Sequence, residues 1–224
     1  MQVTKKFIKP YFVSIIYTFI CLQTFILYFI DPSLQINRIF GDTIDALNSG
    51  EFYRTITSFW IHYSSGMLVD LILLFIVGHL IEKYLGHLTL AILFPVFGIV
   101  GNIVCDIARQ IILKRTINGA APVWLNTNDL SGVYTGSSVA INALLAVLLL
   151  SVLFSSKIRN KYLSGQPIKI TLIVILFLFF VISWITPLLL HEQFFFYEIA
   201  HILGFIIGFL TVLIYVGIVK IIKK

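Results

Sequence analysis

Long apolar stretches constrain this chain more than any other feature of its sequence. A helix that crosses the hydrocarbon core of a bilayer needs roughly 20 mostly apolar residues. Six stretches meet that requirement, and they lie at about 11–30, 65–82, 88–112, 135–154, 168–190 and 196–219. The pattern predicts an all-α protein, a bundle of six transmembrane helices that forms one domain over residues 1–224.

The composition supports lipid as the solvent for much of this chain. Hydrophobic residues make up 59% and charged residues only 12% of the sequence, against about 45–50% and 25% in soluble domains. A chain of 224 residues could not hide that much apolar surface from water. Lys5, Lys6 and Lys9 precede the first stretch, which is too long for the apolar region of a signal peptide, so we expect a retained first helix.

Basic residues predict the orientation of the chain in the membrane. If the N-terminus is cytoplasmic, eleven lysines and arginines fall on the inner side and five on the outer side, as the positive-inside rule requires. An even number of spans returns the C-terminus to the cytoplasm. The net charge of +6 sits at helix ends rather than along one face, which argues against nucleic acid as a partner. Without a transit sequence, we expect the plasma membrane.

Polar groups inside the spans are the candidates for chemistry, because they are costly in lipid. They are Asp70, Asn102, Asp106, Ser137, Ser138, Asn142 and His201. Cys21 and Cys105 both lie in spans and are interpreted as small apolar fillers. The sequence has no glycine-rich phosphate loop and no metal-ligand cluster, so no cofactor and no metal site are expected.

Ser138 and His201 are the two groups that we expect to meet. Each lies about one turn below the outer surface, Ser138 after Gly136 and His201 beside a stripe of small residues. Ala200, Gly204 and Gly208 recur at four-residue spacing, which lets another helix approach closely. A hydroxyl and an imidazole at one depth are the minimum for a serine nucleophile with a histidine base. The alternatives are a serine bonded to its own helix, and a histidine that packs or relays protons.

The sequence resembles the rhomboid family of intramembrane serine proteases over roughly residues 50–210. Four pieces carry the resemblance: the segment 51–57 with Tyr53-Arg54, the segment 78–86 with Glu82-Lys83, Gly136-Ser137-Ser138, and Ala200-His201 followed by Gly204 and Gly208. The resemblance implies a rhomboid-like six-helix fold and a Ser138–His201 dyad without an obligatory carboxylate. It also implies cleavage of transmembrane protein substrates near the outer face, with the Ser138 backbone N–H facing the oxyanion.

The sequence departs from the family pattern around the oxyanion. Family members usually carry His-x-x-x-Asn at the start of the second span. Counted back from Glu82-Lys83 the two places fall on Gly66 and Asp70, and counted forward from His62 they fall on Met67 and Leu71. Asp70 either stays protonated and donates a hydrogen bond, stays ionised and orients His201, or is a packing group. Asn142, one turn beyond Ser138, either bonds His201 or forms a structural bond between helices. Val139 stands where the family prefers glycine.

Three functions remain open at this stage. An active rhomboid-like endopeptidase is favoured because Ser138 and His201 are both retained. An inactive rhomboid-like protein that binds transmembrane segments is favoured by the missing His and Asn. A small transporter or channel is disfavoured, because transporters tend to show inverted repeats and broken helices near the midplane, whereas no such symmetry is visible here and the polar residues gather toward the outer face. Asp106 and Arg109, three residues apart, are expected to form a local pair.

Overall fold

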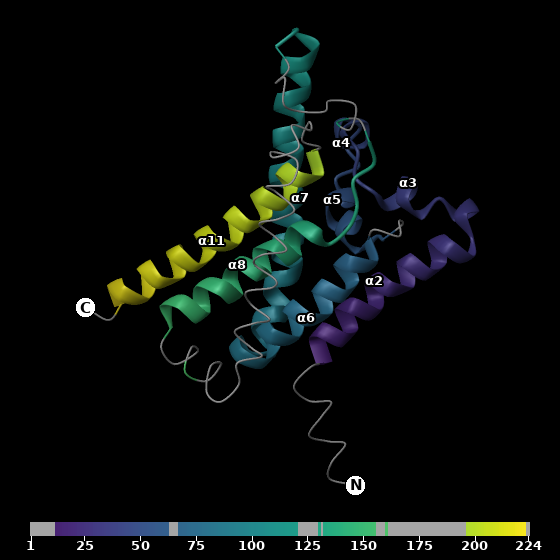
Figure 1. Ribbon diagram of the computed structural model, residues 1–224. Coiled ribbons are helices and arrows are strands. Elements are labelled where there is room, and N and C mark those ends of the chain that lie inside the picture. The colour runs from purple at the N-terminus through teal and green to yellow at the C-terminus, as the bar shows by residue number, and fades with distance from the viewer. Residues whose placement is uncertain are drawn as a thin grey trace, which may run out of the picture.

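A computed structural model describes residues 12–62, 67–120, 130, 132–155, 160 and 196–222. The long helices in these ranges are α2 (Phe12–Ile30), α6 (Met67–Leu85), α7 (His87–Ile117), α8 (Ser138–Phe154) and α11 (Phe196–Ile222). They pack side by side as a bundle (Figure 1). The spans expected at 11–30, 65–82, 135–154 and 196–219 correspond to α2, α6, α8 and α11. The span expected at 168–190 lies outside the described residues.

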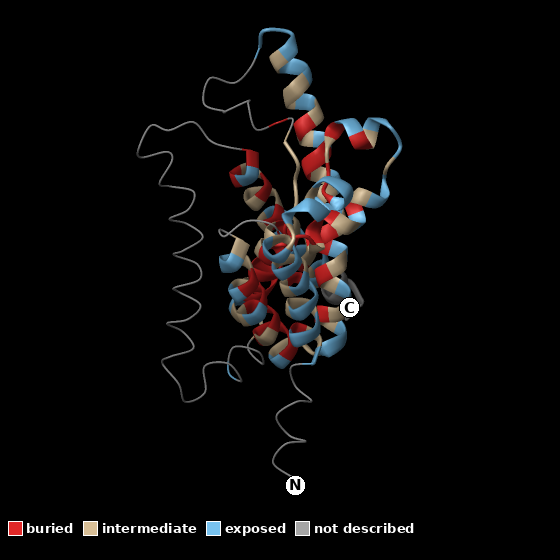
Figure 2. Ribbon diagram, turned by 90° about the vertical axis from the view of Figure 1, so that its right-hand side faces the viewer, coloured by how far each residue is buried: buried red, intermediate tan, exposed pale blue. Residues whose placement is uncertain are grey.

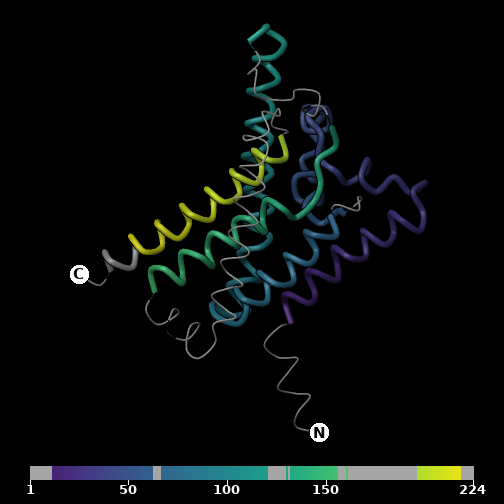
Figure 3. Tube along the Cα trace, viewed as in Figure 1, coloured from purple at the N-terminus to yellow at the C-terminus, as the bar shows by residue number. Residues whose placement is uncertain are grey.

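Helix α7 is longer than its expected span of 88–112. It continues to Ile117, and its last turns project beyond the neighbouring helices (Figure 3). Its 31 residues correspond to a length of about 46 Å at 1.5 Å per residue, which exceeds the hydrocarbon core of a bilayer. Lys114 and Arg115 stand in its last turn, where cations interact favourably with the helix dipole.

The outer faces of the long helices are apolar. Three described helices, Phe12–Ile30, His87–Ile117 and Phe196–Gly217, are long and apolar enough to cross a membrane. On α2 the side chains of Phe12, Phe19 and Phe29 are each more than half exposed, and such side chains are suited to contact with lipid tails. Figure 2 shows exposed residues on the outer faces and buried residues gathered in the middle of the bundle.

Helix α8 is the central element of the bundle. It packs against α6, α7 and α11, and almost all of its residues from Val139 to Leu150 are buried. A helix that is apolar on every side is suited to such a position. Ser138, at its first turn, is therefore held by the best-packed part of the molecule.

Glu82 joins the two helices that start the bundle. Its carboxylate accepts hydrogen bonds from the first-turn N–H groups of Val13 (2.9 Å) and Ser14 (3.0 Å) of α2 and from Ser14 Oγ (2.7 Å). Because the orphan N–H groups at a helix N-terminus attract anions, this side chain of α6 caps α2. Gly86, at a φ of +104°, then reverses the chain between α6 and α7. We refer to this side as the Glu82 end and to the opposite side as the Ser138 end.

The segment between α2 and α6 forms a series of short helices at the Ser138 end. They are η2 (Pro32–Leu34), α3 (Ile36–Phe40), α4 (Ile44–Asn48), α5 (Tyr53–Thr57) and η3 (Ser58–Trp60). Arg54 holds this segment together: its Nε donates to Glu51 at 2.6 Å, and its Nη1 donates to the carbonyls of Arg38 and Gly41. The segment thereby forms a compact support beside the first turn of α8.

Candidate functional site

The turn before Ser138 has a conformation that glycine adopts most readily. Gly136 has a φ of +103°, in the region that L side chains rarely enter, and its N–H donates to Ser58 O at 3.0 Å. Helix α8 then begins at Ser138, after Ser137 at the N-cap position. The Ser138 N–H is therefore one of the first-turn donors that no helix carbonyl satisfies, and the helix dipole favours negative charge there.

His62 is a site-supporting residue that sequence reasoning did not assign. Its Nε2 lies 3.2 Å from Ser137 Oγ and its Nδ1 lies 3.2 Å from Trp60 O. A carbonyl can only accept, so the Nδ1 hydrogen donates to Trp60 and Nε2 accepts from the Ser137 hydroxyl. Both side chains are fully buried, and burial lowers the pKa of His62 to about 4. The neutral imidazole therefore fixes the turn that precedes Ser138.

Nothing in the spacing of the sequence could have revealed that contact. His62 and Ser137 are 75 residues apart, and the only signal was a histidine close to the start of the second span. In the sequence, His62 was one of two starting points for locating the His-x-x-x-Asn positions of the family, and neither count reaches a His and an Asn. Gly66 lies outside the described residues.

Asn142 bonds within its own helix. Its Nδ2 donates to the backbone carbonyl of Ser138 at 2.8 Å. Neither bond weighed for it from the sequence, to His201 or to another helix, is among the hydrogen bonds of the described residues. The reason is geometric: a residue four positions along a helix lies directly over the earlier carbonyl. Asn142 thus braces the first turn of α8, on which Ser138 stands.

Helices α8 and α11 approach each other through glycine. A Cβ built on Gly204 would lie 2.4 Å from Val139 O, and one built on Gly208 would lie 2.1 Å from Ala143 O. Both distances are below any contact that real Cβ atoms show, so the two backbones touch where the glycines stand. Ala200, one turn earlier on α11, is buried. The two helices run side by side in the same direction (Figure 1).

This contact sets the level of His201 relative to Ser138. Gly204 lies against Val139, the residue after Ser138, and His201 precedes Gly204 by almost one turn. Ser138 therefore stands in the first turn of α8 and His201 in the second turn of the adjacent, parallel α11, and both are partly buried. The described residues form no hydrogen bond between them. The His201 ring centroid lies 6.0 Å from that of Tyr197.

Gly101 of α7 explains how α8 accommodates the bulky side chain of Val139, next to Ser138. A Cβ built on Gly101 of α7 would lie 2.4 Å from Val139 Cγ1. The valine side chain thus fills the space that a side chain at Gly101 would need, while its backbone faces Gly204. The small residue that close packing demands is on α7 rather than on α8.

Asp70 lies beside the Gly136 turn. A Cβ built on Gly136 would be 3.7 Å from Asp70 Oδ2 and 3.2 Å from Met67 Cε. The carboxyl group of α6 is therefore next to the turn that precedes Ser138. This placement is compatible with a protonated donor and with an ionised partner alike.

Arg109 holds the chain that leads into the site. The pair expected from the spacing forms, with Arg109 Nη1 at 3.4 Å from Asp106 Oδ1. Its Nη2 donates to the carbonyls of Leu130 (3.1 Å) and Gly132 (3.2 Å). The guanidinium also stacks over the Tyr134 ring, 4.0 Å from its centroid. One fully buried side chain of α7 thus fixes the loop that ends at Gly136.

An isolated β-bridge completes that support. Asp42 N–H donates to Tyr134 O and Tyr134 N–H donates to Asp42 O, both at 2.8 Å. The bridge ties the short-helix segment to the loop before Ser138. Sequence analysis had given Asp42 and Tyr134 no role, because neither lies in a periodic apolar stretch.

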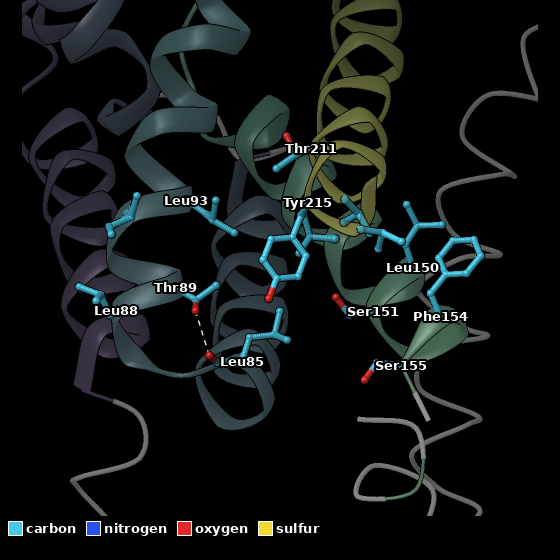
Figure 4. Close-up of a pocket in the computed structure, with 14 residues that line it drawn as sticks. Leu85, Leu88, Thr89, Leu93, Leu150, Ser151, Phe154, Ser155, Thr211 and Tyr215 are labelled. Carbon is cyan, nitrogen blue, oxygen red and sulfur yellow. Dashed lines mark hydrogen bonds between the residues drawn. The ribbon is translucent and has the colours of Figure 1, made fainter. Parts of the chain in front are cut away.

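Cavities lie at both ends of the part of the bundle that the structure describes. One of about 50 Å³ is lined by Ser138, Gly136, Asp42, Asp106 and Arg109, among others. The other, of about 560 Å³, lies at the Glu82 end between α7, α8 and α11, and its walls are mostly apolar (Figure 4). Within the described residues there is no group of three or more His, Cys, Asp or Glu side chains that could hold a metal ion.

Comparison with known proteins places this arrangement in a family. A family model for the rhomboid domain matches residues 49–218, which is most of the chain. Comparison with curated proteins gives no match. The matched region contains α5, α6, α7, α8 and most of α11, and with them the Gly136 turn, Ser138 and His201. The chain belongs to the rhomboid family.

Proposed function

We propose that this protein is an intramembrane serine endopeptidase that cleaves transmembrane substrate proteins through Ser138 and His201. The observation that carries the proposal is the glycine contact between α8 and α11. Because Gly204 and Gly208 lie against the backbone of α8, Ser138 and His201 stand within one helical turn of each other along two adjacent helices, which supports their pairing. Rhomboid proteins are usually serine proteases, and this pair supplies the nucleophile and base that the chemistry requires.

Each group has a defined task in the proposed reaction. Ser138 Oγ attacks the peptide carbonyl while His201 takes the hydroxyl proton, and His201 then gives that proton to the leaving amine. The Ser138 backbone N–H, at the start of α8, donates to the developing oxyanion. Water then hydrolyses the acyl-enzyme by the reverse use of the same two groups. A dyad of this kind needs no metal and no cofactor.

The proposed orientation puts the Ser138 end at the outer membrane face. It rests on the excess of lysine and arginine in the segments that would be cytoplasmic. Both termini are then cytoplasmic, and the plasma membrane is the proposed location. Cysteine-accessibility labelling of positions near each terminus in intact cells tests this orientation, and labelling from outside would reverse it.

Two substitutions test the dyad directly. The full-length protein is reconstituted with a model single-span substrate, and the cleavage product is followed by gel and mass spectrometry. We expect Ser138→Ala and His201→Ala each to abolish the product and to abolish labelling by a fluorophosphonate. Ser151→Ala is the matched control, because it removes a hydroxyl from the opposite end of the same helix. A product that persists in Ser138→Ala would refute the assignment of the nucleophile.

A protein that binds transmembrane segments without cutting them is the second candidate. It is favoured by the carboxyl group of Asp70 beside the Gly136 turn, because an ionised carboxylate would repel an oxyanion. Asp70→Asn separates the possibilities. Retained cleavage supports a protonated donor at this position, and lost cleavage in a folded variant supports an ionised group that orients His201. Substrate capture by a wild type that never cleaves and is never labelled would favour the binder.

A further inference from the structure

Two carboxyl groups meet beside the loop that leads to Ser138, and the proposed reaction uses neither. Asp42, in the segment between α2 and α6, forms a side-chain hydrogen bond with Asp106 of α7. An ionised carboxylate can only accept hydrogen bonds, so this contact requires that the pair holds one proton. Asp42 is 2% exposed and Asp106 is 6% exposed. The shared proton is therefore withdrawn from water.

The charges around the pair balance as long as this proton is present. With one proton the pair carries one negative charge, and Arg109 Nη1, 3.4 Å from Asp106 Oδ1, balances it. Arg54, the other cation that acts on Asp42, is paired with Glu51 at 2.6 Å. Loss of the proton would add a second buried negative charge, and both of these cations already have a carboxylate partner. Burial also raises the pKa of Asp42, so the proton is retained above the pH at which an isolated aspartate ionises.

Other titratable side chains face the small cavity that the pair shares with Ser138. They are the thiol of Cys105, next to Asp106 on α7, and the phenols of Tyr134 and Tyr197. A thiol and a phenol ordinarily ionise at about pH 8.5 and about pH 10, so all three are neutral at neutral pH. The charge of the described cavity walls is then that of the carboxyl pair and Arg109.

Asp42 is also the residue to which the loop before Ser138 is tied. Its N–H donates to Tyr134 O and its carbonyl accepts from Tyr134 N–H, both at 2.8 Å. Gly136 follows two residues later, and α8 begins at Ser138. The side chain of Asp42 thus holds its segment to α7, while its backbone holds the loop to the same segment. A displacement of Asp42 would reach the Gly136 turn through two backbone hydrogen bonds.

We propose that Asp42 is a positioning residue for catalysis, and that the proton it shares with Asp106 keeps Ser138 in place for attack. The inference rests on the proposed peptidase function. When the proton leaves for solvent, the two carboxylates repel each other and Asp42 moves away from Asp106. The bridge to Tyr134 carries that movement to the Gly136 turn, and the Ser138 hydroxyl loses its alignment with the base. A misplacement of about 1 Å is enough to cost about 100-fold in rate.

The test is the pH dependence of labelling by a fluorophosphonate, measured for the full-length protein in detergent from about pH 6 to about pH 10. Each rate is divided by the rate of the same variant at neutral pH. In the wild type we expect the rate to fall by up to about tenfold per pH unit once the pair releases its proton. The loss should reverse when the sample is returned to neutral pH.

Two isosteric variants replace the shared proton with a permanent donor. In Asp42→Asn the amide N–H donates to the Asp106 carboxylate, and in Asp106→Asn the amide N–H donates to Asp42. Either pair keeps one negative charge beside Arg109 at every pH of the series, so we expect both variants to lose the alkaline fall. The matched controls are Asp45→Asn, which changes an exposed aspartate of α4, and Cys105→Ala, and both should keep the fall.

An alkaline fall that persists in both asparagine variants would overturn the proposal, and so would a wild type that labels equally at all these pH values. A fall that disappears in Cys105→Ala would belong to the thiol, and one that does not reverse would belong to unfolding; either result also overturns the proposal. In all of these cases labelling at neutral pH leaves the proposed function intact. A wild type that is never labelled and cleaves no substrate would refute the proposed function, and the role of Asp42 with it.

Discussion

The contact between α8 and α11 predicts that a single methyl group will inactivate the protein. In Gly204→Ala the new Cβ would lie 2.4 Å from Val139 O and 3.1 Å from Val139 Cα. An ordinary contact begins at 3.4 Å, so the helices must separate by about 1 Å. The atoms that the new Cβ would meet belong to the backbone of α8, so they cannot rotate away as a side chain could.

The magnitude follows from two opposing terms. Alanine gains about 1 kcal/mol of helix propensity over glycine, whereas overpacking of this kind costs about 1–3 kcal/mol. The net loss of stability is therefore modest, about 0–2 kcal/mol. Activity should fall far more, because a misplacement of 1 Å between reacting groups costs about 100-fold.

Gly217→Ala is the matched control on the same helix. A Cβ built there meets no atom within 4 Å, so this variant should keep full activity and gain slightly in stability. Cleavage of a model substrate and thermal unfolding in detergent provide the two measurements. If Gly204→Ala cleaves as fast as Gly217→Ala, the reasoning that glycine contact aligns Ser138 with His201 is wrong.

Three further predictions test the supports of the site. Glu82→Ala should destabilise the protein by about 3 kcal/mol or more, because buried donors of α2 lose a charged acceptor; equal melting temperatures of wild type and variant would contradict this. Burial lowers the pKa of His62 from its ordinary value of 6.5 to about 4, which predicts stability that is complete above pH 6.5 and falls by about 3 kcal/mol toward pH 4, since the unfolded chain then binds more protons. His62→Gln should flatten this slope in unfolding measurements, and a slope that persists would refute the assignment. Arg109→Lys should lower fluorophosphonate labelling about tenfold, because one ammonium cannot replace two nitrogens that hold the Asp106 carboxyl group and the Leu130 and Gly132 carbonyls together; unchanged labelling would exclude a role in positioning the loop.

Local sequence patterns were enough to predict the long helices but not the short helices between α2 and α6. The apolar stretch at 135–154 predicts α8 because a spanning helix must satisfy its own backbone. The short helices of residues 32–60 show no such period, and they exist through contacts such as those of Arg54 with Arg38 and Gly41. Since these contacts join residues more than ten apart, no local pattern reveals them.

The candidate site divides in the same way. The four-residue spacing of Ala200, Gly204 and Gly208 predicted that these small residues share one face of α11, because the period of a helix alone decides which residues share a face. It could not show that Gly101 of α7 makes room for Val139, or that His62 accepts a hydrogen bond from Ser137. It also suggested partners for Asn142 on other helices, whereas the nearest acceptor was one turn away on its own helix.

Apolar length and helical period are local properties of the chain, so they were enough to indicate a membrane-embedded helical protein and to predict a serine and a histidine at one depth. Only the tertiary structure decided what surrounds Ser138: the carboxyl group of Asp70, the His62 bond and the cavity walled by Asp42, Asp106 and Arg109. These groups come from four separate segments, and their meeting depends on helix packing, which no single stretch of sequence encodes.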